Sequence, residues 1–340
     1  MDSISAAVIG ASGYSGAELI SLLGRHRFVR LGNLFAHSSA GKQLDEVFPR
    51  FTSVVKLPLE SYSPEAACSN DVIFIALPSG EAMNIVPELL KRGKRIIDLG
   101  GDFRLKDPAV YEQYYRRPHT APDQLKTAVY GLPEWNRSAL KTAKLVANPG
   151  CYPTGATLPL LPLLKKGLIR KQGIVVSSLS GVSGAGRSAS TDLSFTEVNE
   201  SVRAYKVGVH QHLPEIQSVL SGFSGDRVTV TFVPHLLPIT RGIYTSLYAP
   251  MASEFSLDTV TDIYAQYYGG EPFVRFSPDR IPEIKNVTGT NFIDIGYRLD
   301  RENKCLIILS VIDNLVKGAA GQAIQNMNTM FGFDETEALI

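Results

Sequence analysis

The sequence has too few cysteines for a disulfide framework and almost no imbalance of charge. Three cysteines and no Cys-x-x-Cys pair predict free thiols in a reducing compartment. The 34 basic and 33 acidic residues leave a formal net charge of +1, which excludes a general attraction to nucleic acid or to an anionic membrane. No apolar run reaches membrane-spanning length, and no basic region precedes the first apolar stretch as it would in a signal peptide. We therefore predict a cytoplasmic protein with neither nucleic acid nor a membrane as a partner.

The 340 residues are more than one hydrophobic core usually serves, and the character of the sequence changes near residue 150. Before that point, short apolar segments alternate with helix-like segments, which predicts a doubly wound parallel sheet. The expected strands are 4–10, 29–36, 71–78, 94–101 and 143–150, the last of them long, and the expected helices are 14–26 and 81–93.

After residue 150, five strand-like segments are separated mostly by loops, and several of them alternate polar with apolar residues. This pattern predicts a mixed or antiparallel sheet with one covered face. The five segments are 173–181, 227–235, 241–250, 291–299 and 304–313, followed by an expected helix over 314–332.

A glycine-rich turn joins the first expected strand to the first expected helix. The stretch "VIGASGYSGAEL" places Gly10, Gly13 and Gly16 in this turn. Glycines allow the backbone to turn tightly and to approach a pyrophosphate, which then lies at the helix N-terminus. A plain glycine-rich turn would share the pattern, but the strand–turn–helix context favours a dinucleotide cofactor.

The end of the second expected strand indicates which dinucleotide is bound. NAD sites usually carry a carboxylate there for the ribose 2′-hydroxyl. Here the segment "FAHSSAGK" has no carboxylate and supplies Ser38, Ser39 and Lys42 instead. Hydroxyl donors and a cation suit a 2′-phosphate, so NADP is favoured over NAD, although a solvated surface loop would have a similar composition.

One cysteine lies at a bend in "NPGCYPTGATLPLLPLL", residues 148–164. Asn-Pro-Gly forms a turn readily, and Pro153 suits the first turn of a helix. We therefore expect Cys151 at a helix N-terminus, where the macrodipole and free N–H groups favour the nucleophilic thiolate. Pro159 and Pro162 each remove a backbone donor, which predicts a short or kinked helix. A small buried residue at a domain junction is the alternative for this cysteine.

A cysteine nucleophile requires a base, and "VGVHQHLPEI" provides His210 and His212. Either histidine could instead lie on the surface or pack in the core. A zinc site formed by these two histidines with His235 and Cys151 is a further alternative, but the set has no specific metal-ligand spacing.

For two further features, the residues alone favour a structural role over a catalytic or binding role. Cys68 and Cys305 lie in helix-like or strand-like segments without a turn. The loop over 178–190 is rich in glycine and serine and could form an anion nest, but composition alone favours a mobile loop.

Taken together, seven segments resemble the N-acetyl-γ-glutamyl-phosphate reductases of arginine biosynthesis, within the semialdehyde dehydrogenase superfamily. The resemblance covers nearly the whole chain, in the same order. The segments are "GASGYSGAEL", "IDLGGDFRL", "VYGLPEWNR", "ANPGCYPTGA", "GVSGAGR", "GVHQHLPEI" and "DNLVKGAAGQA". One departure is Gly100-Gly101, where the family commonly has Ser-Ala.

The resemblance implies an α/β protein with the architecture of glyceraldehyde-3-phosphate dehydrogenase. Residues 1–150, joined by the C-terminal helix 314–332, would form an NADP-binding Rossmann domain. Residues 151–313 would form a catalytic, substrate-binding and oligomerisation domain with a mixed sheet, in a homodimer or homotetramer.

The resemblance also implies roles for individual residues. Cys151 matches the nucleophile and His210 the acid–base residue, with His212 as a competitor for that role. The residues matching substrate-binding positions are Arg104, His212 and, less specifically, Arg241. The residues matching cofactor-binding positions are Gly10, Ser12, Gly13, Tyr14, Ser15, Gly16, Ser38, Ser39, Lys42, Pro78, Ser79, Gly184 and Asn314. No metal site is implied.

The implied reaction uses NADPH to reduce a small-molecule acyl phosphate through a cysteine thioester. Three alternatives stay open at this point. A reductase of carrier-linked aminoadipyl phosphate in lysine biosynthesis would share these motifs, a non-enzymatic NADP-binding sensor would share the fold, and a zinc hydrolase would use the histidines differently.

Overall fold

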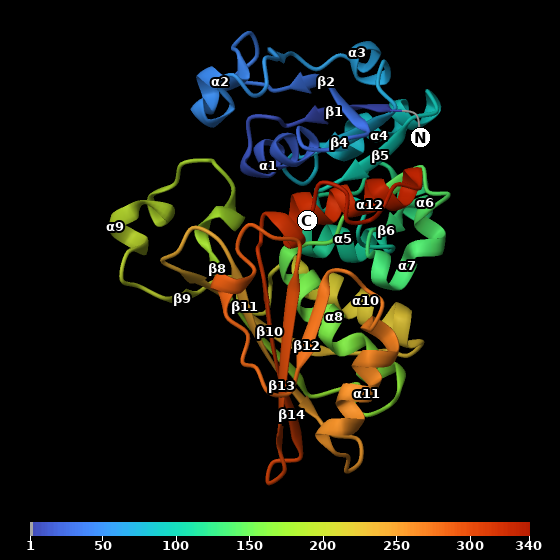
Figure 1. Cartoon of the computed structure of the whole chain (residues 1–340), viewed down its shortest axis with the longest axis vertical. Coiled ribbons are helices and arrows are strands. Elements are labelled where there is room, and N and C mark those ends of the chain that lie inside the picture. The colour runs from blue at the N-terminus through green and yellow to red at the C-terminus, as the bar shows by residue number, and fades with distance from the viewer. Residues whose placement is uncertain (1–2) are drawn as a thin grey trace. The chain divides into compact units, whose positions relative to one another are not determined.

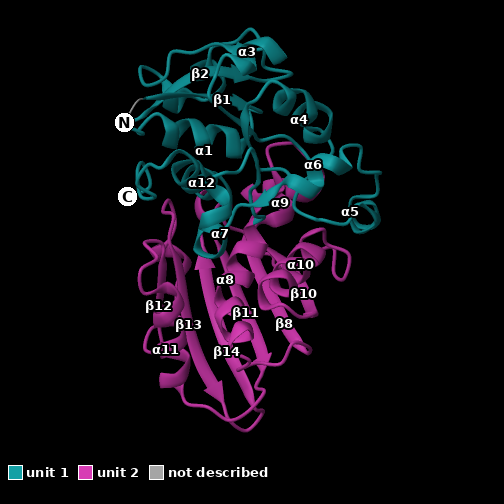
Figure 2. Cartoon of the chain, turned by 90° about the vertical axis from the view of Figure 1, so that its right-hand side faces the viewer, with its two compact units in different colours: residues 1–150, 319–340 teal, residues 151–318 magenta. Residues whose placement is uncertain are grey.

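The computed structural model describes residues 3–340, which divide into two compact units (Figure 2). Unit 1 contains the chain up to Gly150 together with Ala319–Ile340. Unit 2 contains Cys151–Gly318. The C-terminal segment therefore belongs to the same unit as the N-terminal sheet, although most of the sequence separates them.

Unit 1 is built around a seven-stranded sheet in the order β3-β2-β1-β4-β5-β7-β6, and every pair of neighbours is parallel. The predicted doubly wound parallel sheet is confirmed. Its strands are β1 (Ile4–Ile9), β2 (Val29–Phe35), β3 (Leu59–Glu60), β4 (Val72–Ile75), β5 (Arg95–Asp98), β6 (Val129–Tyr130) and β7 (Leu145–Ala147). The order reverses between β1 and β4, and ligands of such sheets bind at the carboxyl ends beside that reversal.

One expected strand differs from the prediction. A strand is present within 143–150, but its predicted length is wrong, because β7 has only three residues and the Asn-Pro-Gly segment after it belongs to neither a helix nor a strand. The edge strands β3 and β6 have two residues each, too few to leave an apolar pattern.

Helices connect the strands of unit 1, as the right-handed crossovers of a parallel sheet require. They are α1 (Tyr14–Leu23), α2 (Leu44–Val47), α3 (Pro64–Cys68), α4 (Ala82–Lys91), α5 (Pro108–Tyr115), α6 (Pro122–Thr127) and α7 (Pro133–Leu140). A further helix of unit 1, α12 (Gly321–Phe331), follows the last strand of unit 2. The C-terminal helix α12 packs against α1, α7 and β5. Among residues 3–340, no helix combines the length and apolarity needed to cross a bilayer.

Unit 2 contains a mixed seven-stranded sheet in the order β12-β13-β14-β11-β8-β10-β9, which confirms the predicted second sheet. Its strands are β8 (Ile174–Gly181), β9 (Arg203–Ala204), β10 (Val230–Leu237), β11 (Ile243–Pro250), β12 (Val274–Ser277), β13 (Ile293–Asp300) and β14 (Cys305–Ile312). The pairs β8–β10 and β12–β13 are parallel and the other pairs are antiparallel.

Three long helices lie on the same side of this sheet (Figure 1), and a short one, α9, lies in the loop after β8. They are α8 (Cys151–Lys165), α10 (His212–Ser224) and α11 (Leu257–Tyr268), and the short one is α9 (Phe195–Val198). Burial alternates along β8 and β11, so that one face is covered by the helices and the other is partly exposed.

Of the two alternatives predicted for α8, a short or a kinked helix, its length contradicts the short one. It runs for fifteen residues with Pro159 and Pro162 inside it. Each proline lacks the N–H that would pair with the carbonyl four residues earlier. The freed carbonyl of Gly155 accepts a hydrogen bond from the Ser310 hydroxyl at 2.6 Å, and that of Leu158 accepts one from Tyr268 at 2.6 Å. Hydroxyls from β14 and α11 thus satisfy buried carbonyls that the helix cannot satisfy itself.

Candidate active site

Cys151 is the first residue of α8, as the turn sequence predicts, and its side chain is half-buried. The helix N-terminus is a favourable place for a thiolate, because unpaired N–H groups and the helix dipole stabilise negative charge. The backbone of Gly318 lies directly against Cys151, and a Cβ on Gly318 would lie 2.7 Å from the Cβ of Cys151. Only glycine fits at position 318 without displacing the cysteine.

Aromatic residues connect the start of α8 to the histidine pair. The ring of Tyr152 lies 5.6 Å from that of His210 and 5.7 Å from that of His212, and the two imidazoles are 4.8 Å apart. The hydroxyl of Tyr152 is 3.0 Å from that of Tyr205. Burial, with a smaller contribution from Cys151, raises the pKa of Tyr205 to about 12, so both phenols stay protonated at neutral pH. Sequence reasoning missed both tyrosines, because neither lies in a pattern that points to chemistry.

His210 is buried and lies two residues before the start of α10 at His212. The backbone N–H of His212 donates a hydrogen bond to Nδ1 of His210 at 3.0 Å. The neutral imidazole must therefore carry its proton on Nε2. Burial, assisted by the nearby charge of Lys206, lowers the pKa of His210 to about 3. At neutral pH this residue is a neutral hydrogen-bond donor.

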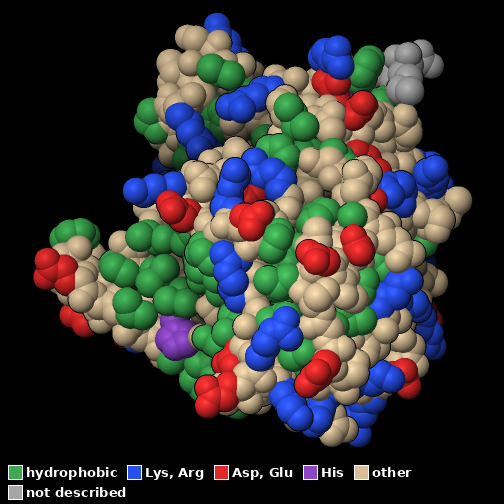
Figure 3. All heavy atoms as spheres, turned by 60° about the horizontal axis from the view of Figure 1, so that its bottom comes forward, with side chains coloured by type: hydrophobic (Ala, Val, Ile, Leu, Met, Phe, Trp, Pro, Cys, Tyr) green, Lys and Arg blue, Asp and Glu red, His purple; other side chains and the backbone are tan. Residues whose placement is uncertain are grey.

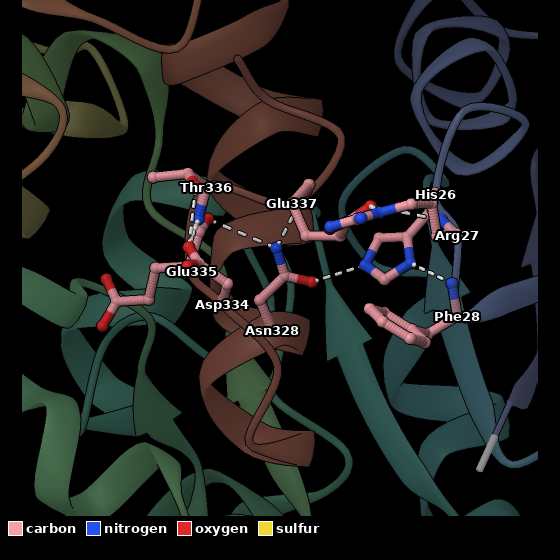
Figure 4. Close-up of polar contacts among 8 residues, drawn as sticks. All are labelled: His26, Arg27, Phe28, Asn328, Asp334, Glu335, Thr336 and Glu337. Carbon is pink, nitrogen blue, oxygen red and sulfur yellow. Dashed lines mark hydrogen bonds and ion pairs between the residues drawn. The ribbon is translucent and has the colours of Figure 1, made fainter. Parts of the chain in front are cut away.

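His26 in unit 1 accepts the same kind of hydrogen bond on Nδ1, from the N–H two residues later (Figure 4). It also shows how Nε2 is paired in a histidine with a structural role. The N–H of Phe28 donates to Nδ1 of His26 at 3.2 Å, and Nε2 lies 2.9 Å from the Oδ1 atom of Asn328. Among residues 3–340, by contrast, none pairs with Nε2 of His210. That N–H is available to a ligand.

The three glycines of the glycine turn in unit 1 are favoured for different physical reasons. Gly10 has φ +91°, and a Cβ there would lie 2.3 Å from the carbonyl oxygen of Ala76. A Cβ on Gly16 would lie 2.2 Å from the oxygen of Gly10. Gly13 is different, because a Cβ there would meet only that oxygen, at an ordinary 3.5 Å. No packing against any residue of 3–340 requires glycine at 13, which suits close approach by a ligand phosphate.

Gly13 is also the N-cap of α1, and no side chain caps this helix or places a carboxylate in its first turn. The residues present therefore fit an anion at this helix N-terminus. Ser12, Tyr14 and Ser15 belong to the same turn and first helical residues. This arrangement is the fit expected of a dinucleotide pyrophosphate.

The remaining predicted cofactor residues of unit 1 lie in loops after strands. Ser38 and Lys42 are exposed and Ser39 is half-buried, in the turns that follow β2. Pro78 and Ser79 follow β4, where the hydroxyl of Ser79 accepts a hydrogen bond from the N–H of Gly101 at 3.3 Å.

Arg104 follows β5 and is held by backbone carbonyls of its own unit. Its Nε donates to the oxygen of Asn148 at 2.9 Å, and Nη2 donates to that of Leu99 at 2.7 Å. Asn148 immediately precedes the Pro-Gly of the cysteine turn. The guanidinium therefore has a fixed direction, as a group that contacts an anion would need.

The Gly100-Gly101 departure from the family has a structural explanation. A Cβ on Gly101 would lie 2.2 Å from the hydroxyl oxygen of Tyr115, so alanine would not fit beside this tyrosine. A Cβ on Gly100 would lie 3.0 Å from an oxygen of Asp98, which is fully buried. Burial and the neighbouring Asp102 raise the pKa of Asp98 to about 7.

In unit 2, Asn314 connects the second glycine-rich loop to the turn that carries Arg241. Its Nδ2 donates to the Ser183 hydroxyl at 2.9 Å, and its Oδ1 accepts from the N–H of Gly242 at 2.8 Å. A Cβ on Gly184 would lie 3.6 Å from the same Nδ2. Residues 182–185 thus form a turn of 3₁₀ helix within this loop.

The predicted residues accordingly fall into two sets. Unit 2 contains Cys151, His210, His212, Gly184, Arg241 and Asn314, and unit 1 contains the glycine turn, the serine and lysine residues after β2, Pro78, Ser79 and Arg104. Among residues 3–340, no group of three or more His, Cys, Asp or Glu side chains has the geometry of a metal site.

Comparison with known proteins identifies the family of each part of the chain. Residues 5–143 match the semialdehyde dehydrogenase NAD-binding domain, and residues 151–314 match the semialdehyde dehydrogenase dimerisation domain. The fold is similar to that of aspartate semialdehyde dehydrogenase II from Vibrio cholerae, with a TM-score of 0.74 and 18% identity, over 98% of this chain and 99% of the other. The NADP-bound aspartate semialdehyde dehydrogenase of Candida albicans has a TM-score of 0.71 at 17% identity, over 97% and 99% of the two chains.

Two relatives share about half of the sequence over its full length. The N-acetyl-gamma-glutamyl-phosphate reductase of Pelotomaculum thermopropionicum is 50% identical, over 99% of this chain and 97% of the relative. The protein of that name from Geobacter metallireducens is 49% identical, over 99% and 98% of the two chains. With both domains matched and full-length relatives half identical, the chain belongs to the semialdehyde dehydrogenase family, among the N-acetyl-gamma-glutamyl-phosphate reductases.

Proposed function

We propose that the chain reduces N-acetyl-γ-glutamyl phosphate to N-acetylglutamate 5-semialdehyde with NADPH, releasing phosphate. The observation that carries the proposal is the full-length similarity to reductases of that name, with Cys151 at the N-terminus of α8. Such a reaction belongs to arginine biosynthesis in the cytoplasm. Its substrate is a small acyl phosphate.

Phosphate-dependent reduction of NADP by N-acetylglutamate semialdehyde, the reverse reaction, tests the proposal directly. We expect turnover that requires phosphate and stops when the cysteines are alkylated. Turnover only with a carrier-linked aminoadipate semialdehyde would assign the chain to lysine biosynthesis. NADP binding without turnover on either aldehyde would indicate a sensor.

The chemistry centres on the thiolate of Cys151. Its sulfur attacks the carbonyl carbon, the carbon–oxygen bond to phosphate breaks with its electron pair, and a thioester remains while phosphate takes a proton from water. When bound, NADPH would supply the hydride that reduces the thioester carbon. The resulting oxyanion re-forms a carbonyl, the carbon–sulfur bond breaks, and the aldehyde leaves with the thiolate restored.

In this reaction His210 acts as a hydrogen-bond donor and not as a base. Its protonated Nε2 and low pKa suit it to donate a hydrogen bond to the carbonyl oxygen as negative charge develops there. The oxyanion expels the thiolate without needing a proton from the imidazole. His210 therefore stabilises charge and stays neutral throughout.

We expect the chain to bind NADP more tightly than NAD. The match to an NAD-binding domain does not distinguish NAD from NADP. The expected preference rests on Ser38, Ser39 and Lys42 and on the absence of a carboxylate directly after β2. Titration of the two oxidised cofactors, followed by fluorescence or calorimetry, measures the preference. Lys42→Ala should weaken NADP and leave NAD unchanged. Equal affinity of the wild type for both cofactors would contradict this assignment.

Arg104 is proposed to bind the phosphate group of the substrate. Arg104→Lys keeps the positive charge but loses the planar fork that the carbonyls of Asn148 and Leu99 now orient. We expect a higher KM for phosphate in the reverse assay, by roughly 10-fold or more for a charge-assisted contact, with unchanged NADP affinity. A phosphate KM equal to that of the wild type would give Arg104 a purely structural role.

We propose that the exposed face of the unit 2 sheet is covered by a second copy of the chain, giving a homodimer or, with further contacts, a homotetramer. The matched family domain is described as a dimerisation domain. Figure 3 shows hydrophobic side chains gathered on the left of the molecule, the side of unit 2 opposite its helices in Figure 1. Apolar residues of this face form cross-strand rows, such as Val175, Tyr248 and Ile307. Large exposed apolar faces of this kind mark interfaces.

The oligomer is tested by light scattering on the purified chain. The wild type should have at least twice the mass of one chain, and Tyr248→Glu should be monomeric, because it places a carboxylate in the interface. Tyr248 is 42% exposed, so the substitution leaves the single chain's core intact. Val54→Glu, at an exposed position in unit 1, is the control. A monomeric wild type would overturn the proposal.

A further inference from the structure

Asp313 follows β14 and is a hub of hydrogen bonds that sequence reasoning did not single out. It is fully buried, and its side chain accepts three backbone N–H groups. Oδ1 accepts from Leu315 at 2.8 Å and Val316 at 3.2 Å, and Oδ2 accepts from Gly289 at 2.7 Å. A buried carboxylate needs such partners, because an unpaired buried charge is costly.

The same carboxylate also faces Arg241. Nη1 of Arg241 lies 3.4 Å from Oδ2 of Asp313, and the arginine side chain is 23% exposed. The next residue, Asn314, accepts a hydrogen bond from Gly242. Consecutive residues after β14 therefore contact both the guanidinium and the backbone beside it.

The main chain of Asp313 reaches the nucleophile. Its carbonyl accepts a hydrogen bond from the N–H of Gly318 at 2.9 Å, which closes a π-helical turn over Val316–Ala320. Gly318 is the residue whose backbone lies against Cys151. Single π-helical turns of this kind often occur at functional sites, because they displace the backbone locally.

We propose that Asp313 is a positioning residue that fixes Arg241 through its carboxylate and the backbone behind Cys151 through its carbonyl. The inference rests on the proposed function, in which Cys151 attacks an acyl phosphate, and it assigns Arg241 to the anionic substrate. Asp313 then fixes both the direction of the arginine that binds the substrate and the backbone that supports the nucleophile. A displacement of β14 relative to α8 would disturb both together.

The first test is a cycle of Asp313→Asn, Arg241→Gln and the double variant in the reverse assay. Each single variant should raise the KM for N-acetylglutamate semialdehyde or phosphate by roughly 10- to 100-fold, the size of a charge-assisted hydrogen bond. The double variant should be no worse than Arg241→Gln alone, because Asp313 acts through the arginine. Fold-changes that multiply would overturn the proposal.

Asp294→Asn is a matched control. Asp294 is also a buried aspartate of this sheet, and its Oδ1 accepts from Nε of Arg275 at 2.5 Å. This variant should leave both KM values near those of the wild type. If it raises them as much as Asp313→Asn does, the effect is a general loosening of the sheet, and the proposal fails.

The second test uses the rate at which iodoacetamide alkylates Cys151, which needs no substrate. Gly318→Ala should slow alkylation and lower kcat with little change in KM, whereas Asp313→Asn keeps the main-chain carbonyl that holds Gly318 and should leave the alkylation rate near that of the wild type. Gly318→Ala does not change the side chain of Asp313. It therefore tests the support of Cys151, the second half of the proposal, even if Asp313→Asn does not fold. Unchanged alkylation in Gly318→Ala would overturn that half. A wild type without turnover would refute the proposed function, while the alkylation rates would still test the support of Cys151.

Discussion

Cys151→Ser is expected to abolish almost all turnover, by roughly 10⁴- to 10⁶-fold as for removal of a covalent nucleophile. Serine keeps the shape of the side chain at the start of α8, but its hydroxyl is hardly ionised at neutral pH. NADP binding should survive, because the glycine turn lies in unit 1 and no residue of it changes. Steady-state kinetics and a cofactor titration on the same preparation measure both quantities.

The order of thiol alkylation is an independent check of this prediction. Burial raises the pKa of the Cys68 and Cys305 thiols, whereas Cys151 is at a helix N-terminus. Mass spectrometry after brief iodoacetamide treatment should find Cys151 modified first. Near-normal activity in Cys151→Ser, or first modification at another cysteine, would refute covalent thioester chemistry.

His210→Asn is expected to lower kcat by about 10²- to 10⁴-fold. The Oδ1 atom of asparagine can accept the N–H of His212 as Nδ1 of His210 does, so this local hydrogen bond is kept and the donor at Nε2 is lost. A melting temperature close to that of the wild type would show that the loss is catalytic. His212→Asn is the control, and if it is the more impaired variant, the donor assignment moves to His212.

The pH dependence of kcat separates a neutral donor from a general base. With a pKa of about 3, His210 is neutral throughout the range from pH 5 to pH 8, so its ionisation adds no acidic limb there. A base with an ordinary histidine pKa would lose activity as the pH falls through about 6.5. An acidic limb near that pH that vanishes in His210→Asn would contradict the neutral role.

Local patterns in the sequence predicted most of the long elements. The strands β1, β2, β4 and β5 and the sheet of unit 2 follow from apolar runs and alternation, because side-chain spacing in a strand is set by the backbone itself. The start of α8 at Cys151 follows from Asn-Pro-Gly and from proline in the first turn. The glycine turn follows from its position between a strand and a helix.

Features that depend on distant partners could not be predicted in this way. The two prolines of α8 are tolerated because hydroxyls of Ser310 and Tyr268, more than a hundred residues away, bond to the freed carbonyls. The edge strands β3, β6 and β9 have two residues each and exist only through pairing with their neighbours.

The sequence by itself determined the family of this protein, the class of its fold and the identity of a cysteine and two histidines that suit its chemistry. Each of these follows from short motifs of residue types in a fixed order, and such motifs can be recognised without knowing how the chain packs. Only the tertiary structure decided that His210 carries its proton on Nε2, because the N–H of His212 occupies Nδ1 and burial removes the charge. Only the tertiary structure, likewise, brought Asp313 to Arg241 and placed Gly318 behind Cys151, since those contacts join segments that the sequence keeps far apart.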